Sequence, residues 1–217
     1  EVTAGSIIVK RFYEYDEQGR VAKVRWENHT PYLTQGTEIY HYDGNNQISR
    51  IEKYPGREVL YQWTDGRITK SETIWNGTIH NYSEYAYDDA ENLGGVVTYH
   101  RQNDGSFAKG FYTIYLYFTD GNLYKSLTYQ DSDDPENPYL VSTRIYDSYT
   151  EVANPFPMTE VLPNIKMQKT LATTYRVEDS SGDLLYHMSY EFRADGQPEK
   201  RIATSSTDVQ TAVYHYY

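Results

Sequence analysis

Short turn signals divide this chain at nearly regular intervals. They combine Asp, Asn or Ser with Gly, residues that tolerate the positive φ angles of tight hairpin turns. The clearest are Asp16-Glu17-Gln18-Gly19, Asp43-Gly44, Asp65-Gly66, Asn76-Gly77, Asp104-Gly105, Asp120-Gly121, Ser181-Gly182 and Asp195-Gly196. The intervening segments, about 8–12 residues long and rich in Tyr, Thr, Val and Ile, are typical of consecutive antiparallel strands. Since no long stretch has apolar residues at helical spacing, the pattern predicts an all-β chain.

Tyrosine supplies much of the packing material. The 217 residues include 25 Tyr and 3 Trp but only 6 Phe. A tyrosine ring packs like a hydrocarbon, whereas its hydroxyl group requires a hydrogen-bond partner or water. Such side chains suit a sheet whose faces are partly wet. We therefore predict one β domain over residues 1–217, an antiparallel, soluble up-and-down barrel or strongly curled sheet of about 14 strands.

The hairpins also form a sequence repeat. Its unit is an aromatic strand, an Asp-Gly turn, and a return strand that begins with an apolar and then a basic residue. A lysine stands four residues after the turn glycine in each of four copies, at Lys23, Lys70, Lys125 and Lys200. Because one such hairpin cannot bury a face alone, neighbouring copies must pair into a continuous sheet.

These residues carry a resemblance. The segment from Tyr13 to Val21 resembles the tyrosine-aspartate repeats of bacterial surface and toxin-delivery proteins. The hairpins, together with Asn154-Pro155-Phe156, Leu162-Pro163-Asn164-Ile165-Lys166 and the closing Tyr214-His215-Tyr216-Tyr217, resemble a family of secreted lipoproteins of Gram-negative gut bacteria. That family has a porin-like β fold and no assigned activity. The resemblance implies an exported protein, periplasmic or associated with the outer membrane and cell surface.

A porin-like fold raises the alternative of an outer-membrane barrel, whose strands need an apolar face over about 9–11 residues. Under strict alternation, segment 47–54 places Arg50 and Glu52 on the face of Ile48, and Lys53 on the face of Ile51. Segment 67–75 is interrupted in the same way. We therefore expect contact with a membrane only through a lipid anchor outside these 217 residues.

One region breaks the pattern, an irregular Pro-rich excursion expected over residues 131–166. Its acidic start offers several oxygen ligands, which a hard cation such as Ca²⁺ requires. The candidate ligands are Asp131, Asp133, Asp134 and Glu136. The alternative is a hydrated charged loop, because charge runs with proline are commonly solvated. Elsewhere the His residues are scattered, and we expect no metal site.

The sequence offers no motif for catalysis. It has no Cys, no Gly-rich phosphate loop, no Gly-x-Ser-x-Gly elbow and no His-Glu-x-x-His pair. We therefore expect no catalytic residues and no cofactor. Because Asp and Glu total 31, accidental carboxylate pairs are common, and a glycan-acting enzyme stays an alternative. A net charge of −11 argues against nucleic-acid partners.

The aromatic side chains suggest a binding function. Trp26, Trp63 and Trp75 could form flat platforms that stack on sugar rings. Alternatively, they form the core, since little else is available to fill it. We expect a non-catalytic binding or scaffold module, exported or tethered at the surface, with a polysaccharide or a cell-surface protein as its partner.

Overall fold

Each turn signal of the sequence joins two antiparallel strands. The computed structural model describes residues 6–29, 33–53, 56–132, 138–155, 162, 165 and 167–215. The strands are β1 (Ser6–Tyr15), β2 (Val21–His29), β3 (Leu33–Tyr42), β4 (Ile48–Lys53), β5 (Arg57–Thr64), β6 (Arg67–Trp75), β7 (Thr78–Tyr87), β8 (Leu93–Arg101), β9 (Phe107–Tyr117), β10 (Leu123–Gln130), β11 (Tyr139–Ala153), β12 (Thr170–Asp179), β13 (Gly182–Phe192), β14 (Pro198–Thr204) and β15 (Val209–His215). Within the described ranges, no helix is long and apolar enough to cross a membrane.

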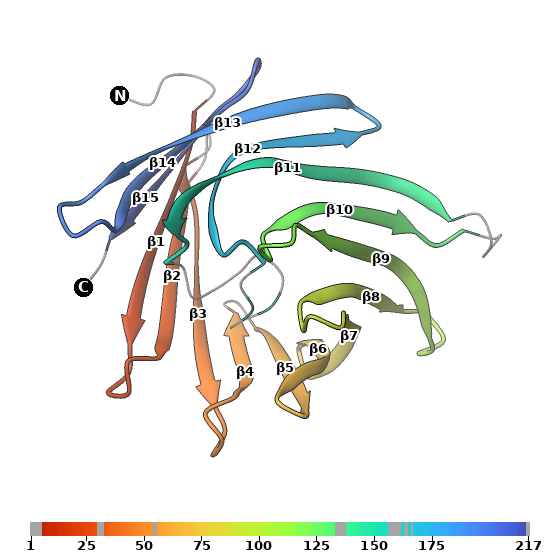
Figure 1. Ribbon diagram of the computed structural model, residues 1–217. Coiled ribbons are helices and arrows are strands. Elements are labelled where there is room, and N and C mark those ends of the chain that lie inside the picture. Colours follow the sequence, from red (N-terminus) through yellow and green to blue (C-terminus); the bar gives the residue numbers. More distant parts are fainter. Residues whose placement is uncertain are drawn as a thin grey trace.

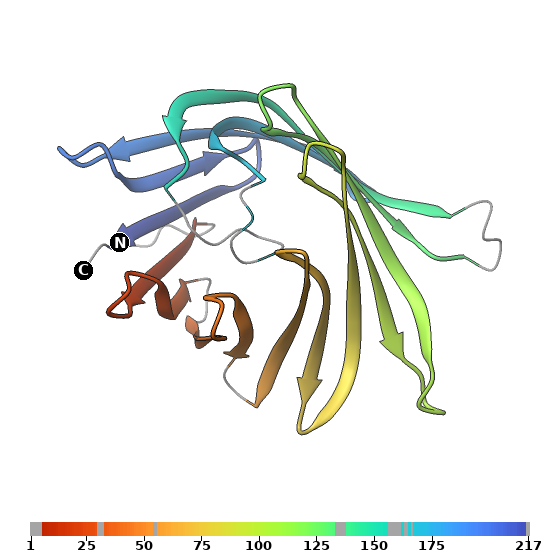
Figure 2. The same ribbon diagram turned by 60° about the horizontal axis from the view of Figure 1, so that its bottom comes forward.

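The strands close into a barrel in chain order (Figures 1 and 2). Every consecutive pair is antiparallel, but β1 and β15 pair in parallel. An odd number of alternating strands requires this, because the first and last strands then run in the same direction. The predicted all-β barrel of about 14 strands is confirmed, with fifteen strands among the described residues and a mixed sheet. Closure removes the exposed edges that invite aggregation.

The turn residues adopt the conformations that the sequence predicts. In the two-residue turns, Asp65 and Gly66 have φ angles of 52° and 78°, and Asn76 and Gly77 have 48° and 75°. In a longer turn, one carboxylate oxygen of Asp16 accepts hydrogen bonds from the amides of Gln18 and Arg20, at 3.0 and 2.8 Å. The repeated aspartate therefore organises the turn.

A ring of buried residues marks the end of the barrel at which each odd-numbered strand from β1 to β9, and β13, turns into the next strand. Each member lies two residues after a turn residue of positive φ. We call this set the core ring: Val21, Ile48, Ile68, Leu93, Leu123 and Pro198. One residue later, β2, β4, β6, β10 and β14 each contain a β-bulge. A bulge shifts the alternation by one residue. The strict alternation predicted for 47–54 is therefore wrong at its start: Ile48 shares a face with Ile51, opposite Arg50 and Glu52.

Aromatic side chains bond each hairpin to its neighbour, and in five of the six cases the acceptor is the carbonyl of a core-ring residue. An aromatic residue near the end of an odd-numbered strand donates a hydrogen bond to a carbonyl of the preceding strand. The bonds are Tyr42 to Val21 (2.8 Å), Trp63 to Ile48 (2.8 Å), Tyr87 to Ile68 (2.9 Å), Tyr117 to Leu93 (2.9 Å), Tyr149 to Leu123 (2.5 Å) and Tyr190 to Ala172 (2.7 Å). The aromatic residue of each repeat thus satisfies the buried polar group of its neighbour.

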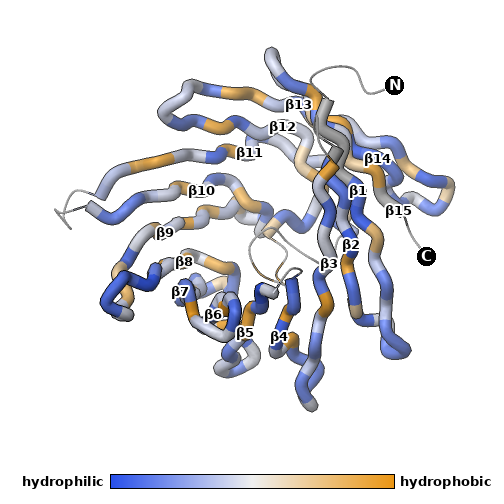
Figure 3. Tube along the Cα trace, turned by 180° about the vertical axis from the view of Figure 1, so that it is seen from behind, coloured by the Kyte–Doolittle hydropathy of each residue, from blue (hydrophilic) through white to orange (hydrophobic). Residues whose placement is uncertain are grey.

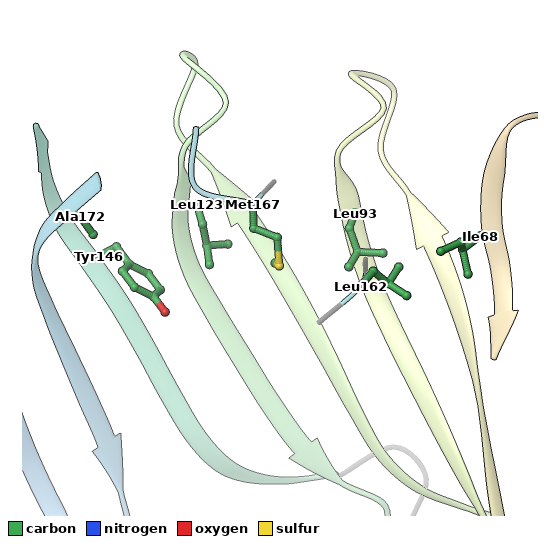
Figure 4. Packing of buried hydrophobic residues seen from close by; sticks show 7 residues of the cluster. All are labelled: Ile68, Leu93, Leu123, Tyr146, Leu162, Met167 and Ala172. Carbon is green, nitrogen blue, oxygen red and sulfur yellow. The ribbon is translucent and has the colours of Figure 1, made fainter. Parts of the chain in front are cut away.

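Two side chains from between β11 and β12, Leu162 and Met167, are buried in the core of the barrel. Leu162 and Met167 pack with core-ring members and with Tyr146 and Ala172 (Figure 4). The Met167 carbonyl also accepts a hydrogen bond from the Leu123 amide, at 2.8 Å. The irregular excursion predicted over 131–166 is corrected in its middle, because the longest strand, β11, occupies Tyr139–Ala153. The pairing of β11 with β12 contains several register shifts, and such bulges bend a strand.

The strand registers divide the side chains between two walls. Directly paired residues share a face, and successive residues alternate between faces. The side chains on the face that packs against Leu162 and Met167 form the inner wall. The side chains on the opposite face form the outer wall. Along the strands, hydrophobic and hydrophilic residues follow one another at short intervals (Figure 3).

Alkaline pH is expected to unfold this barrel steeply. Burial raises the pKa of Tyr87 to about 12, with a contribution from Tyr85, and burial likewise raises the pKa of Tyr61, Tyr117 and Tyr149. Below pH 10 these groups are neutral in both states. Above pH 10 the unfolded chain releases protons that the folded barrel holds, so stability falls as pH rises. Phenolate absorbance at 295 nm, followed with circular dichroism, measures both events.

The same titration in concentrated urea is the control, because all 25 Tyr are then solvated. We expect the native curve to lag behind the urea curve and to rise abruptly where the dichroism signal is lost. Superimposed absorbance curves, with an unchanged dichroism signal, would contradict the burial of these tyrosine side chains.

Candidate functional site

The inner wall carries a band of hydroxyl groups across six neighbouring strands. The pairing of neighbouring strands shows that all members of this band face inward. We call this set the hydroxyl band: Ser71, Ser83, Thr98, Thr113, Thr128 and Ser142. Ser83 and Thr98 are hydrogen-bonded at 2.9 Å, and Thr113 and Thr128 at 3.1 Å. A hydroxyl group both donates and accepts, so each pair keeps further capacity for a ligand.

Aromatic rings lie at the far end of the same wall, away from the core ring. Phe111, which faces inward next to Thr98, is 39% exposed. Its ring contacts His100 edge-on, with centroids 6.1 Å apart. Trp75 ends β6 and is 52% exposed, and its ring lies 5.6 Å from that of His80. Because these inward positions are exposed, water reaches the inner wall at this end.

The three predicted tryptophans are not gathered into one platform. Trp63 packs against the core cluster and donates its indole N–H to the Ile48 carbonyl. Trp26 is half-buried and covers Gly36 on β3, where an added Cβ would lie 2.4 Å from the indole ring. Trp75 lies at the opposite end of β6 from the turn that follows Trp63. Of the three, Trp75 has the geometry of a ligand platform.

A polar cluster lies on the inner wall across β3 and β4. The Tyr40 hydroxyl donates to Glu38 at 2.7 Å, and Lys53 forms an ion pair with the same carboxylate at 3.3 Å. Burial, followed by the negative charge of Glu38, raises the pKa of Tyr40. The carboxylate is therefore neutralised within the barrel, and the arrangement is structural.

Ion pairs cover much of the outer wall. Two of the repeat lysines pair with a glutamate directly across the hairpin: Lys23 with Glu14 at 3.0 Å and Lys200 with Glu191 at 2.7 Å. Lys70 pairs with Glu72 at 2.7 Å along its own strand. Further pairs are Arg25–Glu27, Arg50–Glu52, Arg50–Glu58 and Arg176–Glu178, and the His41 ring contacts Glu52 at 2.9 Å. These sectors would be costly to place in lipid.

The outer wall over β8–β10 is more apolar. Ile114 and Leu116 are 37% and 42% exposed. Tyr112 and Tyr129 stack beside them with ring centroids 4.9 Å apart. Lys125 interrupts this surface, since it pairs in register with Leu116 and faces outward.

The calcium hypothesis falls mostly outside the described residues. Asp133, Asp134 and Glu136 lie there, whereas Asp131 forms an ion pair with Lys109 at 3.3 Å. In the parts of the chain that the structure describes, no group of three or more His, Asp or Glu residues could hold a metal ion.

Sequence reasoning missed the hydroxyl band and Phe111. A signal was present, because Ser or Thr recurs at alternate positions in segments such as 126–128 and 71–73. Alternation alone does not say which face points inward, and the bulges change it. The strand registers were needed to bring these residues together.

Two solved structures have a similar barrel. One is a porin-like protein from Bacteroides vulgatus, with a TM-score of 0.62 and 15% sequence identity over 95% of this chain and 96% of that chain. The other is a porin-like protein from Bacteroides uniformis, with a TM-score of 0.59 and 17% identity over 93% of this chain and 85% of that chain. At these identities the likeness shows the fold alone. No protein-family model and no curated protein matches the sequence.

Proposed function

We propose that this protein is a non-catalytic binding barrel, exported to the periplasm or cell surface, whose inner wall binds a polysaccharide. The observation that carries the proposal is the hydroxyl band, which runs toward exposed aromatic rings on the same wall. Sugars present apolar ring faces and hydroxyl edges. Aromatic rings stack on the former, and protein hydroxyl groups bond to the latter.

We propose no catalytic role for the inner wall. Hydrolysis of a glycosidic bond commonly requires two carboxyl groups, one of which has a raised pKa. Among the ladder-paired residues of the inner wall, Glu38 is held by Lys53 and Tyr40. Asp179 ends β12 at a turn. There its carboxyl group accepts hydrogen bonds from the hydroxyl and the amide of Ser181, which lower its pKa, the hydroxyl having the larger effect. The Asp179 carboxyl group therefore lacks the raised pKa of a general acid, and Glu38 is engaged in structural contacts.

Removal of the exposed rings tests the site. We expect Trp75→Ala and Phe111→Ala each to weaken polysaccharide binding by about 5- to 150-fold, which corresponds to the loss of one stacking contact of about 1–3 kcal/mol. Isothermal titration calorimetry against the polysaccharides retained in a glycan-array screen measures the change.

Phe107→Ala is the matched control. Phe107 is 36% exposed at the same end of the barrel, but it faces outward, against Tyr82. Equal loss of binding in all three variants would count against an inner-wall site, as would a screen with no bound polysaccharide.

The apolar surface over β8–β10 favours a second candidate function, the docking of a cell-surface protein on the outer wall. Leu116→Glu should abolish such a contact while leaving polysaccharide binding intact. Insertion into an outer membrane is the other alternative for this surface. Ion pairs along β2–β6 oppose it, and flotation of the protein with lipid vesicles would reveal it.

A further inference from the structure

The two walls of the barrel differ in charge. Although the whole chain has a net charge of −11, the ladder-paired residues of the inner wall are mainly basic. The basic ones are Arg11, Lys53, Arg57, Arg144 and Arg201. The acidic ones are Glu38 and Asp179. On the outer wall the paired acids are balanced by paired basic residues. The acids are Glu14, Glu27, Glu52, Glu58, Glu72, Glu84, Glu178, Asp183 and Glu191, and the basic residues are Lys10, Lys23, Arg25, Arg50, Lys70, Arg101, Lys109, Lys125, Arg176 and Lys200.

Two of the inward arginines stand beside the features that carry the proposed function. Arg57 pairs directly across the sheet with Trp75, so its guanidinium group belongs to the same face as the exposed indole ring. Arg144 lies two residues from Ser142, the last member of the hydroxyl band, and on the same face. Both arginines are exposed. Each pairing places a cation next to a sugar-binding element.

From this arrangement we infer that the ligand is an acidic polysaccharide, carrying carboxylate or sulfate groups; the inference rests on the proposed function. Guanidinium groups bind such oxyanions through two parallel hydrogen bonds, which an uncharged sugar cannot offer in the same way. The balanced charges of the outer wall and the net negative charge of the chain do not cancel this preference. At physiological ionic strength, charges are largely screened beyond about 8 Å, so a ligand within the barrel responds chiefly to the inner wall.

A matched pair of ligands tests the inference. Polygalacturonate carries one carboxylate per sugar, and its fully methyl-esterified form is uncharged. We expect the full chain to bind polygalacturonate at least tenfold more tightly than the ester in calorimetry, with binding weakened by added salt. Arg57→Gln and Arg144→Gln should each raise the Kd for polygalacturonate about tenfold and leave weak binding of the ester unchanged.

Outward arginines provide the control. Arg25→Gln and Arg50→Gln remove the same charge from the outer wall and should change the Kd by less than about twofold. Circular dichroism confirms that each variant folds. If the outward and inward variants weaken binding equally, the effect is general electrostatics and the inference is overturned.

The failures are distinguishable. Equal binding of polygalacturonate and its ester, lost in Trp75→Ala, would overturn the acidic ligand and keep the polysaccharide site. Binding of neither, together with an empty glycan-array screen that includes sulfated chains, would overturn both proposals.

Discussion

Replacement of Trp63 with alanine is expected to lower the free energy of unfolding by about 3–5 kcal/mol, the range for a large aromatic side chain removed from a core. The indole ring packs against the cluster around Ile68 and Leu93, and its N–H group satisfies the Ile48 carbonyl. The variant therefore loses packing and leaves a buried acceptor unpaired. Urea unfolding followed by circular dichroism measures the change.

Two further variants separate these contributions. Trp63→Phe retains an aromatic ring but lacks the N–H donor. It should lower the free energy of unfolding by about 1–3 kcal/mol, because the Ile48 carbonyl is left without its hydrogen bond. Trp75→Ala, at an exposed position, should change stability by no more than about 0.5 kcal/mol. A Trp63→Ala variant of unchanged stability, with weakened polysaccharide binding, would instead make Trp63 part of the ligand platform.

The hairpins of this barrel are predictable because their determinants are local. Asp65 and Gly66 specify a tight turn without help from the remaining chain, and the same holds at Asn76 and Gly77. The repeat also predicts neighbouring copies that pair. Closure of the barrel depends instead on contact between the first and last strands. No single repeat therefore predicts the parallel pairing of β1 with β15.

Which side chains of a strand lie on the same face could be predicted only in part. Strict alternation correctly places Lys23 and Arg25 on the face opposite Val24. In β4, however, a bulge after Ile48 puts Ile48 on the same face as Ile51, where strict alternation had placed it on the opposite face. The bulge is specified by pairing with β3, a partner that strict alternation ignores. For the same reason the sequence could not tell Trp63, which points into the core, from Trp75, which lies at the far end.

Replacement of Leu162 with alanine is the second change expected to have a large effect. This side chain is 1% exposed and packs between Ile68 and Leu93, although it comes from the connection between β11 and β12 (Figure 4). Loss of a buried leucine side chain costs about 2–5 kcal/mol, and more where the cavity cannot collapse. Core-ring members are held by ladder hydrogen bonds on closed strands, so collapse is restricted and the upper part of the range is expected.

Leu33→Ala is the matched control, because Leu33 is 57% exposed on the outer wall and should change stability by no more than about 0.5 kcal/mol. The connection is part of the cooperative core if tryptophan fluorescence and circular dichroism report one coincident transition in the wild-type chain and in Leu162→Ala. A connection that detached independently would give a small effect for Leu162→Ala and a fluorescence change that precedes the loss of β structure. The inner wall next to it would then be a variable surface, whereas a cooperative core holds the hydroxyl band in one arrangement before a ligand binds.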